Sequence, residues 1–419
     1  NGEPETPTPH THYLCGNGVA CSHVGDHNED SKTTFATAIT QNNDGFVWVG
    51  NEKQDAAYWC TLSKGTYYLA TNLILEHPIT IAEDITLCLS GNSITINADE
   101  NAFEVIYTLS TTGSTFTLTD CMNSGQITHG TTTGGVKYLG NGVSLHQSCN
   151  FIMYGGSITG NTTSGGETTA WRSGGVWVHG SNSTFTMYGG SITGNHNSDG
   201  GGVWVENTGS FTMYGGSITG NSVSGSGGGV FVAAQGGTQQ GRFAMYGGSI
   251  TGNNASSFGS GGVCVYGSMT VSGSVRITDN VNGGSKGDDG IYTGGTASNV
   301  RLVGRTTITI DGPLTEGTQI GVLLYSNRIF TSGWSKNMSD KEISSYFTAD
   351  DSSSTVALEN GELKLSNPHT HSWTYALSTT TTGSATITAT CKNCAENNNT
   401  DFHGGSVTIA APEAVALIY

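Results

Sequence analysis

The sequence predicts an all-β protein whose main part is a right-handed parallel β-helix. Two repeated phrases indicate this fold. The first, Phe-x-Met-Tyr-Gly-Gly-Ser-Ile-Thr-Gly-Asn, starts at Phe151, Phe185, Phe211 and Phe243. The second, Gly-Gly-Val-x-Val, starts at Gly174, Gly201, Gly228 and Gly261. Repeats of this length are typical of solenoids, in which each repeat packs only on its neighbours.

Each repeat is expected to supply three short strands. In Phe185-Thr186-Met187 the apolar side chains alternate with threonine, which is the period of a strand and not of a helix. In Val203-Trp204-Val205 the two valines share one side, so the tryptophan faces the other. The repeated Phe, Met, Ile and Val residues form the predicted core, and about 11 turns of three strands fit the repeat region.

Glycine and asparagine mark the predicted corners. Gly189-Gly190 permits a sharp turn because glycine adopts positive φ without steric cost. Equivalent corners after glycine hold Asn161, Asn195, Asn221 and Asn253. We expect their amides to hydrogen-bond from one repeat to the next as a ladder.

The chain is expected to have three parts. Residues 1–59 form an N-terminal arm and an irregular cap that covers the open end of the parallel strands. Residues 60–366 form the β-helix, with a short helix predicted over 340–347. Residues 367–419 form a small C-terminal β-module, the start of an immunoglobulin-like domain, because strand-like alternation occurs at 372–377, 385–391 and 406–410.

The composition and the chain ends suggest a protein outside the cell. Charged residues make up only 11% of the chain and the net charge is −17, so nucleic acid and acidic membrane surfaces are unsuitable partners. No apolar run is long enough to insert into a membrane. The chain starts at Asn1 and stops at Tyr419 within a strand-like run, so we expect a removed signal peptide and a longer parent protein.

These features resemble the pectin-lyase-like superfamily of parallel β-helix proteins, in particular the large secreted adhesin-like surface proteins of Gram-positive gut bacteria. The resemblance covers roughly residues 60–365. Besides the repeats, it depends on Gly65–Leu69, Leu87–Leu89, Leu118–Cys121 and Asp288–Tyr292. It implies the fold, but the superfamily includes polysaccharide lyases, glycosidases and non-catalytic adhesins.

An outward aromatic strip is the predicted binding surface. Trp177, Trp204 and Phe231 occupy the same position of successive Gly-Gly-Val-x-Val strands, and Trp171 lies in a neighbouring long loop. Exposed aromatic strips suit the stacking of sugar rings or contact with another protein. The alternative is that the long loops 162–173 and 233–242 fold over these rings.

Two further outward rows repeat along the chain. One consists of Tyr154, Tyr188, Tyr214 and Tyr246, which lie beside the corners and are interpreted as structural. The other consists of Thr and Ser residues such as Thr193 and Thr219. It resembles a flat ice-binding face, but the ranks are expected to be short and interrupted.

The sequence predicts no catalytic residue and no cofactor. The only charged residues between Phe151 and Gly262 are Glu167, Arg172, Asp199, Glu206 and Arg242. Asp199 and Glu206 are separated by an extended strand of about 20 Å, which is too far for a glycosidase pair. They are interpreted as solvated loop charges. The favoured function is an adhesive or structural stalk that binds a glycan or surface protein; the alternatives are a polysaccharide lyase or glycoside hydrolase, and a passive spacer.

Cysteine and acidic clusters leave the question of metal binding open. Cys15 and Cys21 suggest a disulfide, or a zinc site with the nearby histidines, and Cys391 and Cys394 suggest a disulfide or a metal clip. Adjacent Asp288-Asp289 suggests a calcium ligand pair or a turn. The strand-like runs hold core thiols or short bridges at Cys88, Cys121, Cys149 and Cys264.

Overall fold

A computed structural model describes residues 10–13, 32–43, 46–54, 60–97, 104–108, 113–132, 135, 138–146, 148–163, 173–235, 239–256, 259–324, 327–338, 343–366, 373–379, 384–391 and 405–410. The chain forms two compact units. The first contains residues 1–352 and 356–365, and the second contains residues 353–355 and 366–419.

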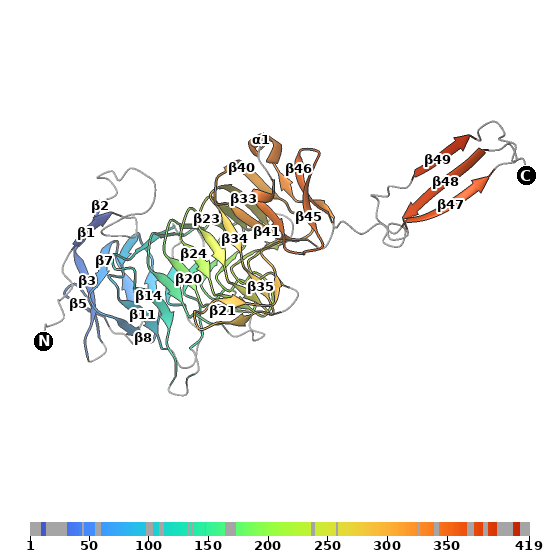
Figure 1. The fold of residues 1–419 in the computed structure, drawn as a ribbon. Coiled ribbons are helices and arrows are strands. Elements are labelled where there is room, and N and C mark those ends of the chain that lie inside the picture. The colour runs from blue at the N-terminus through green and yellow to red at the C-terminus, as the bar shows by residue number, and fades with distance from the viewer. Residues whose placement is uncertain are drawn as a thin grey trace, which may run out of the picture. The chain divides into compact units, whose positions relative to one another are not determined.

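The first unit is built of long, mostly parallel sheets (Figure 1). One of them has 13 strands. In spatial order they are β43 (Thr331–Ser332), β40 (Ile308–Leu314), β33 (Ser268–Gly273), β29 (Arg242–Met245), β23 (Ser210–Met213), β19 (Thr184–Met187), β16 (Asn150–Met153), β13 (Thr115–Thr119), β10 (Ile85–Cys88), β7 (Gly65–Leu69), β3 (Thr37–Gln41), β4 (Val47–Val49) and β5 (Glu52–Gln54).

The second large sheet has 19 strands and contains two parallel ladders that meet at β41 (Gln319–Leu323). Before β41 the first ladder runs through β8 (Leu73–Leu75), β11 (Ser93–Ile96), β14 (Gln126–His129), β17 (Ser157–Thr159), β20 (Ser191–Thr193), β24 (Ser217–Thr219), β30 (Ser249–Thr251) and β34 (Arg276–Thr278). The second runs through β6 (Cys60–Leu62), β9 (Ile79–Ile81), β12 (Ile106–Thr108), β15 (Val143–Leu145), β18 (Val176–Val178), β22 (Val203–Val205), β26 (Val230–Val232), β32 (Val263–Val265) and β39 (Val300–Leu302), with β44 (Phe347–Ala349) beyond β41.

Each sequence repeat supplies one strand to each ladder, which is compatible with a parallel β-helix. The pairing aligns identical residues, so Met187 is opposite Met213 and Met213 is opposite Met245. These methionines are buried, and Phe185 and Phe211 stack beside them with ring centroids 4.6 Å apart. The predicted inward columns are therefore confirmed.

The predicted asparagine ladder is also confirmed, and it is longer than expected. In each step the backbone N and Nδ2 of one asparagine donate to Oδ1 of the next, as between Asn195 and Asn221 at 3.0 and 2.9 Å. The ladder joins Asn161, Asn195, Asn221, Asn253, Asn280 and Asn299 and ends on Asp350. These asparagines are buried, and the ladder supplies the hydrogen bonds that their amide groups would otherwise make with water.

The repeated glycines are needed because successive corners touch. A Cβ atom on Gly175 would lie 2.4 Å from the carbonyl oxygen of Gly202, and Gly190 has a φ of +80°. Any larger side chain at either position would push the strands apart or strain the backbone. A small sheet forms where the chain leaves the asparagine ladder. It contains β21 (His196–Asn197), β25 (Ser222–Val223), β31 (Asn254–Ala255), β35 (Val281–Asn282) and β38 (Thr296–Ala297).

The N-terminal region is more regular than predicted. β1 (His10–Tyr13) pairs with β2 (Lys32–Phe35), and β3 pairs in parallel with β7, so the 13-stranded sheet starts at Thr37. The strands β3 and β4 form because Ile39 and Val47 are fully buried in the common core. The interpretation of residues 13–59 as irregular is corrected for this part. Cys15 and Cys21 lie outside the described residues.

The helical segment also differs from the prediction. Helix α1 (Trp334–Met338) lies before the segment expected to be helical, and within 340–347 the described residues contain only the 3₁₀ helix η2 (Ile343–Ser345) and the first residue of β44; residues 340–342 lie outside the described residues. Trp334 and Met338 are one turn apart, and both are buried against the core. The remaining described strands before residue 367 are β27 (Ala234–Gln235), β28 (Gln239–Gln240), β36 (Ser285–Lys286), β37 (Tyr292–Thr293), β42 (Arg328–Ile329), β45 (Thr355–Glu359) and β46 (Glu362–Ser366).

The second unit contains an antiparallel sheet of three strands. They are β47 (Trp373–Thr379), β48 (Ser384–Cys391) and β49 (Gly405–Ala410). These strands coincide with the three predicted runs. Cys394 lies outside the described residues.

Candidate functional site

The residues of the predicted aromatic strip are aligned as expected, but their side chains are largely buried. Trp177 pairs with Trp204, and Trp204 pairs with Phe231, as their strand positions require. However, Trp177 and Trp204 are each only 6% exposed, and Phe231 is partly buried. The expectation of an exposed strip is therefore wrong for the two tryptophans. Trp171 lies outside the described residues, and binding by these residues stays a prediction.

Trp177 is covered by polar residues that directly follow its own strand and the two adjacent strands. The rings of His179 and His146 lie 4.4 and 5.9 Å from its ring. Its Nε1 donates a 3.0 Å hydrogen bond to Oε1 of Glu206, and Nδ1 of His179 lies 2.9 Å from the same oxygen. The indole therefore has its polar group satisfied within the protein.

Trp204 is covered by its own strand and the next repeat. Its ring lies 4.5 Å from the ring of Phe231, and it belongs to a small apolar cluster with Trp177 and Ala233. Gly200, in the turn before the strand, packs closely on it, since a Cβ atom there would lie 2.9 Å from the Trp204 Cβ. The glycine-rich turn thus places main-chain atoms directly against the Trp204 side chain.

The charges near this strip also differ from the prediction. Glu206 is only 1% exposed, so it is not a solvated loop charge. Asp199 accepts a 2.6 Å hydrogen bond from the backbone N of Ser226 and so holds a turn of the next repeat. Burial, and then the charge of His179, lower the pKa of His146 to about 4. Sequence spacing alone carries no signal for this buried cluster.

A second buried carboxyl group lies on the same ladder, just before β12. Tyr107 is aligned with Ser144, and Ser144 with Trp177, so Tyr107 occupies the register of the strip. Glu104, three residues earlier, is 2% exposed, and its Oε2 has no hydrogen-bond partner among the described residues. Burial raises the pKa of Glu104 to about 7. The protonated form is favoured because a buried charge without a partner is costly.

The exposed aromatic row is the tyrosine row. Tyr188 and Tyr214 are 43% and 48% exposed, and Tyr154 and Tyr246 at the two ends are partly exposed. Successive rings stack with centroids 5.0, 5.0 and 5.2 Å apart and interplanar angles of 9°, 8° and 29°. Because each inner ring covers the faces of its neighbours, the row presents ring edges and hydroxyl groups. The sequence had favoured a purely structural interpretation of this row.

Two hydroxyl rows lie on the ladder that contains β20 and β24 (Figure 1), and in each repeat they follow the tyrosine after the Gly-Gly corner. The serine row aligns Ser157, Ser191, Ser217 and Ser249. The threonine row aligns Thr159, Thr193, Thr219, Thr251 and Thr278. All are partly exposed. The expectation that these ranks are interrupted is therefore wrong, because the register holds across four strands for serine and five for threonine.

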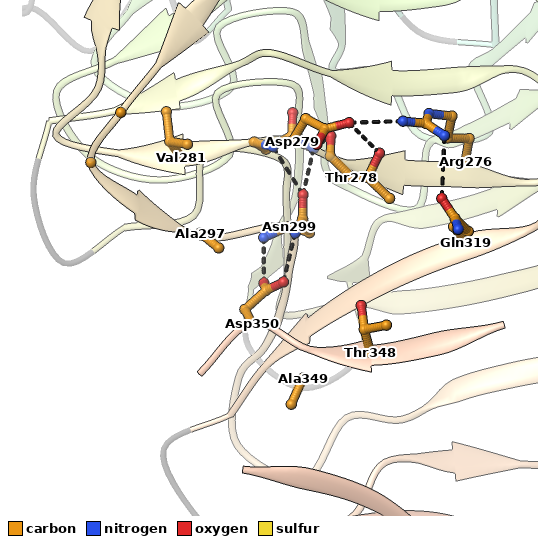
Figure 2. A pocket seen from close by; sticks show the side chains of 13 residues that line it. Arg276, Thr278, Asp279, Val281, Ala297, Asn299, Gln319, Thr348, Ala349 and Asp350 are labelled. Carbon is orange, nitrogen blue, oxygen red and sulfur yellow. Dashed lines mark hydrogen bonds and ion pairs between the residues drawn. The ribbon is translucent and has the colours of Figure 1, made fainter. Parts of the chain in front are cut away.

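The serine row continues into a polar pocket of about 510 Å³ (Figure 2). Ser249 is aligned with Arg276, and Arg276 with Gln319, and both of these line the pocket. Thr278, the last member of the threonine row, lines it as well. The pocket floor contains the last two members of the asparagine ladder and Asp350. The hydroxyl rows therefore lead directly to a concave site.

Charged and amide side chains in the pocket hold one another in place. Arg276 donates from Nη2 to Asp279 at 2.8 Å and from Nη1 to Gln319 at 3.2 Å. Asp350 accepts two 2.6 Å hydrogen bonds from Asn299, and burial raises its pKa. Figure 2 shows both groups among the side chains that line the pocket. A preorganised set of carboxylates, an amide and a guanidinium suits the recognition of hydroxyl groups.

We call the tyrosine, serine and threonine rows together with this pocket the hydroxyl face. Its far side is bordered by the β36–β37 hairpin, since the backbone N of Tyr292 donates to the carbonyl oxygen of Gly252 at 3.1 Å. From Phe151 to Ser249 no charged residue belongs to the three rows. The feature of the sequence that corresponds to this face is the repeated hexapeptide Tyr-Gly-Gly-Ser-Ile-Thr.

The predicted metal ligands are not gathered into a site in the described part of the chain. Oδ1 of Asp289 accepts a 3.0 Å hydrogen bond from the backbone N of Ile291, as expected for a turn. Among the described residues no group of three His, Cys, Asp or Glu side chains is placed to hold a metal ion. The cluster around Cys15 and Cys21, and Cys394, lie outside the described residues.

No helix in the described ranges has the length and apolar character required to cross a membrane. Searches against family models, curated proteins and solved structures found no match to this chain.

Proposed function

We propose that this chain is a segment of a secreted bacterial surface protein that binds an extended, neutral glycan along its hydroxyl face. In this proposal the parallel sheets form a right-handed β-helix of the pectin-lyase-like type with about 11 turns. The rod then serves as an adhesive stalk. The resemblance of the repeats to adhesin-like surface proteins supports the setting, and the hydroxyl face supports the ligand class.

The observation that carries the proposal is the regular repeat of the exposed tyrosines. Successive ring centroids are 5.0 to 5.2 Å apart, so their hydroxyl groups form an evenly spaced line along the ladder. An extended polysaccharide presents hydroxyl groups at a similar regular spacing. A linear chain lying along the row would meet an equivalent donor and acceptor at each sugar residue.

The hydroxyl rows, which contain no charged residue from Phe151 to Ser249, favour a neutral ligand along most of the face. Serine and threonine hydroxyls both donate and accept, which matches the hydroxyl groups of sugars. The stacked inner rings leave no open face for sugar stacking, so we infer that recognition uses hydrogen bonds and ring edges. One end of the glycan would then occupy the pocket, where Arg276, Gln319 and Asp279 provide directional hydrogen bonds.

Binding is tested on a glycan array and by calorimetry with neutral polysaccharides. The double variant Tyr188→Ala/Tyr214→Ala should lose binding by tenfold or more, because it removes the centre of the row. Tyr188→Phe should lose less, since it keeps the ring and removes one hydroxyl group. A matched control is Tyr266→Ala, because Tyr266 is 40% exposed and lies beside Phe231, outside the row.

Three outcomes would overturn the proposal. The first is a complete lack of retention on the glycan panel. The second is an equal loss of binding in the control variant. The third is capture of a host surface protein by the tyrosine row, which would assign the row to protein adhesion. Release of reducing or unsaturated sugar ends by the wild-type chain would instead favour the enzymatic alternative.

A further inference from the structure

Cys88 and Cys121 bring two thiol groups into contact between consecutive strands of the 13-stranded sheet. Their Sγ atoms lie 3.6 Å apart, although 33 positions separate them in the chain. Cys88 ends β10, and its register partner Thr119 ends β13, two residues before Cys121. We propose that Cys88 and Cys121 form a disulfide bond that staples these two strands in an oxidising environment.

The distance that the sulfur atoms must move is small. A disulfide has an S–S length of about 2.05 Å, so the two atoms need to approach by roughly 1.5 Å. The bond would lie outside the main core, in a small cluster with Phe35 and Tyr68. The Sγ atoms are already in contact across the paired strands β10 and β13, so rotation of the side chains can supply this movement.

Asp120 holds the two cysteine-bearing turns together. Its Oδ1 accepts a 2.7 Å hydrogen bond from the backbone N of Gly91, and its Oδ2 accepts a 2.6 Å bond from the N of Gly125. The carboxylate is fully buried. It therefore links the turn after Cys88 with the turn that contains Cys121. The thiols are kept in contact by a hydrogen-bond network that is independent of them.

The two thiols differ in access, which sets the order of the reaction. Cys88 is fully buried and Cys121 is partly exposed. A small oxidant such as oxidised glutathione would react first at Cys121, forming a mixed disulfide and releasing one glutathione thiol. Cys88 would then attack the Cys121 sulfur and release the second glutathione. One glutathione disulfide is thus reduced to two thiols while the two protein thiols are oxidised to one disulfide, and their protons leave with the products.

Contact with Cys88 and burial both raise the pKa of the Cys121 thiol. Because the thiolate is the attacking species, the folded protein should oxidise slowly at neutral pH and faster as the pH rises. Formation of the bond during folding, when the thiols are more accessible, avoids this barrier.

The experiment incubates the full chain with oxidised glutathione, blocks remaining thiols under denaturing conditions, and maps the peptides by mass spectrometry without reduction. We expect one cross-linked peptide pair that joins Cys88 to Cys121, lighter than the two separate peptides by two hydrogen atoms. The melting temperature should rise by several degrees and return to its original value after reduction, because the bond restricts the unfolded chain.

Two variants make the result specific. Cys121→Ser should abolish both the cross-link and the redox-dependent shift in melting temperature, whereas Cys264→Ala, which removes a buried thiol elsewhere, should keep both. Full alkylation of Cys88 and Cys121 after oxidation would overturn the proposal. Pairing of either residue with a different cysteine would overturn it as well. The wild-type map decides the question even if a variant fails to fold.

Discussion

The tyrosine row and the tryptophan strip are both aromatic rows that repeat from one sequence repeat to the next, but they end in opposite environments. The tryptophans lie within strands β18 and β22, whereas Tyr188 and Tyr214 lie in the bends that follow strands β19 and β23. Yet Tyr214 is 48% exposed and Trp204 only 6% exposed. The difference lies in the segments that pack beside each row. A tight Gly-Gly corner comes directly after Tyr214, whereas the tryptophan strip is covered by a glycine turn, by histidine rings and by a buried carboxylate. Alternation along a strand therefore sets direction, and neighbouring segments set exposure.

The largest expected effect tests this contrast directly. Trp204→Ala should lower the free energy of unfolding by about 3–5 kcal/mol, because it leaves a cavity where a buried indole was packed. Tyr214→Ala should change it by less than about 1 kcal/mol, as for most exposed positions. Urea denaturation of both variants gives the comparison. Equal losses in the two variants would mean that the rows do not differ in burial.

The second prediction concerns Glu104, which lies just before β12 on the ladder that carries the strip. Its folded-state pKa is about 7, and its ordinary value is 4.5. Below pH 4.5 the carboxyl group is protonated in both states and has no effect. As the pH rises towards 7 the unfolded chain ionises first, so the folded state loses stability. Glu104→Gln removes this loss, and it should raise the free energy of unfolding by about 3 kcal/mol at pH 8.

The same substitution should have almost no effect on the free energy of unfolding at pH 4, and the measurement at this pH is the internal control. Histidines titrate equally in the variant and the wild type, so their contribution cancels in the difference. A gain that is independent of pH would contradict the assignment of Glu104 as the titrating group.

The third and smallest effect concerns the polar cover of Trp177. Glu206→Ala should cost about 1–3 kcal/mol, because the Trp177 Nε1 hydrogen would be left buried without its acceptor. Tryptophan fluorescence and urea denaturation measure the change. The matched control is Glu76→Ala, which removes an exposed carboxylate. If both variants behave alike, the cluster contributes nothing to covering the indole.

The inward half of the fold could be predicted from the sequence. The repeated Phe and Met residues indicated the buried columns, and the Gly-Asn corners indicated the amide ladder. These features depend on a short local period that is copied from one repeat to the next. The end of the ladder on Asp350 could not be predicted, since this carboxylate lies 51 positions after Asn299 and outside the repeats.

The candidate site was only partly predictable. The sequence pointed to outward aromatic rows but favoured the strip of Trp177 and Trp204, which the structure buries. The positions of Arg276 and Gln319 at the end of the serine row could not be predicted. The strands keep their register there, but their sequence no longer matches the repeated phrase. The burial of Glu104 and Glu206 required side chains from several repeats.

The sequence by itself thus determined the strand period, the direction of each side chain and the stacking of like residues, because all three depend on local geometry repeated along the chain. Only the tertiary structure decided which outward row meets solvent, which carboxyl groups are buried and where the hydroxyl rows meet a pocket. Exposure depends on every segment that packs against a residue, and most of these segments are distant in sequence and differ from repeat to repeat.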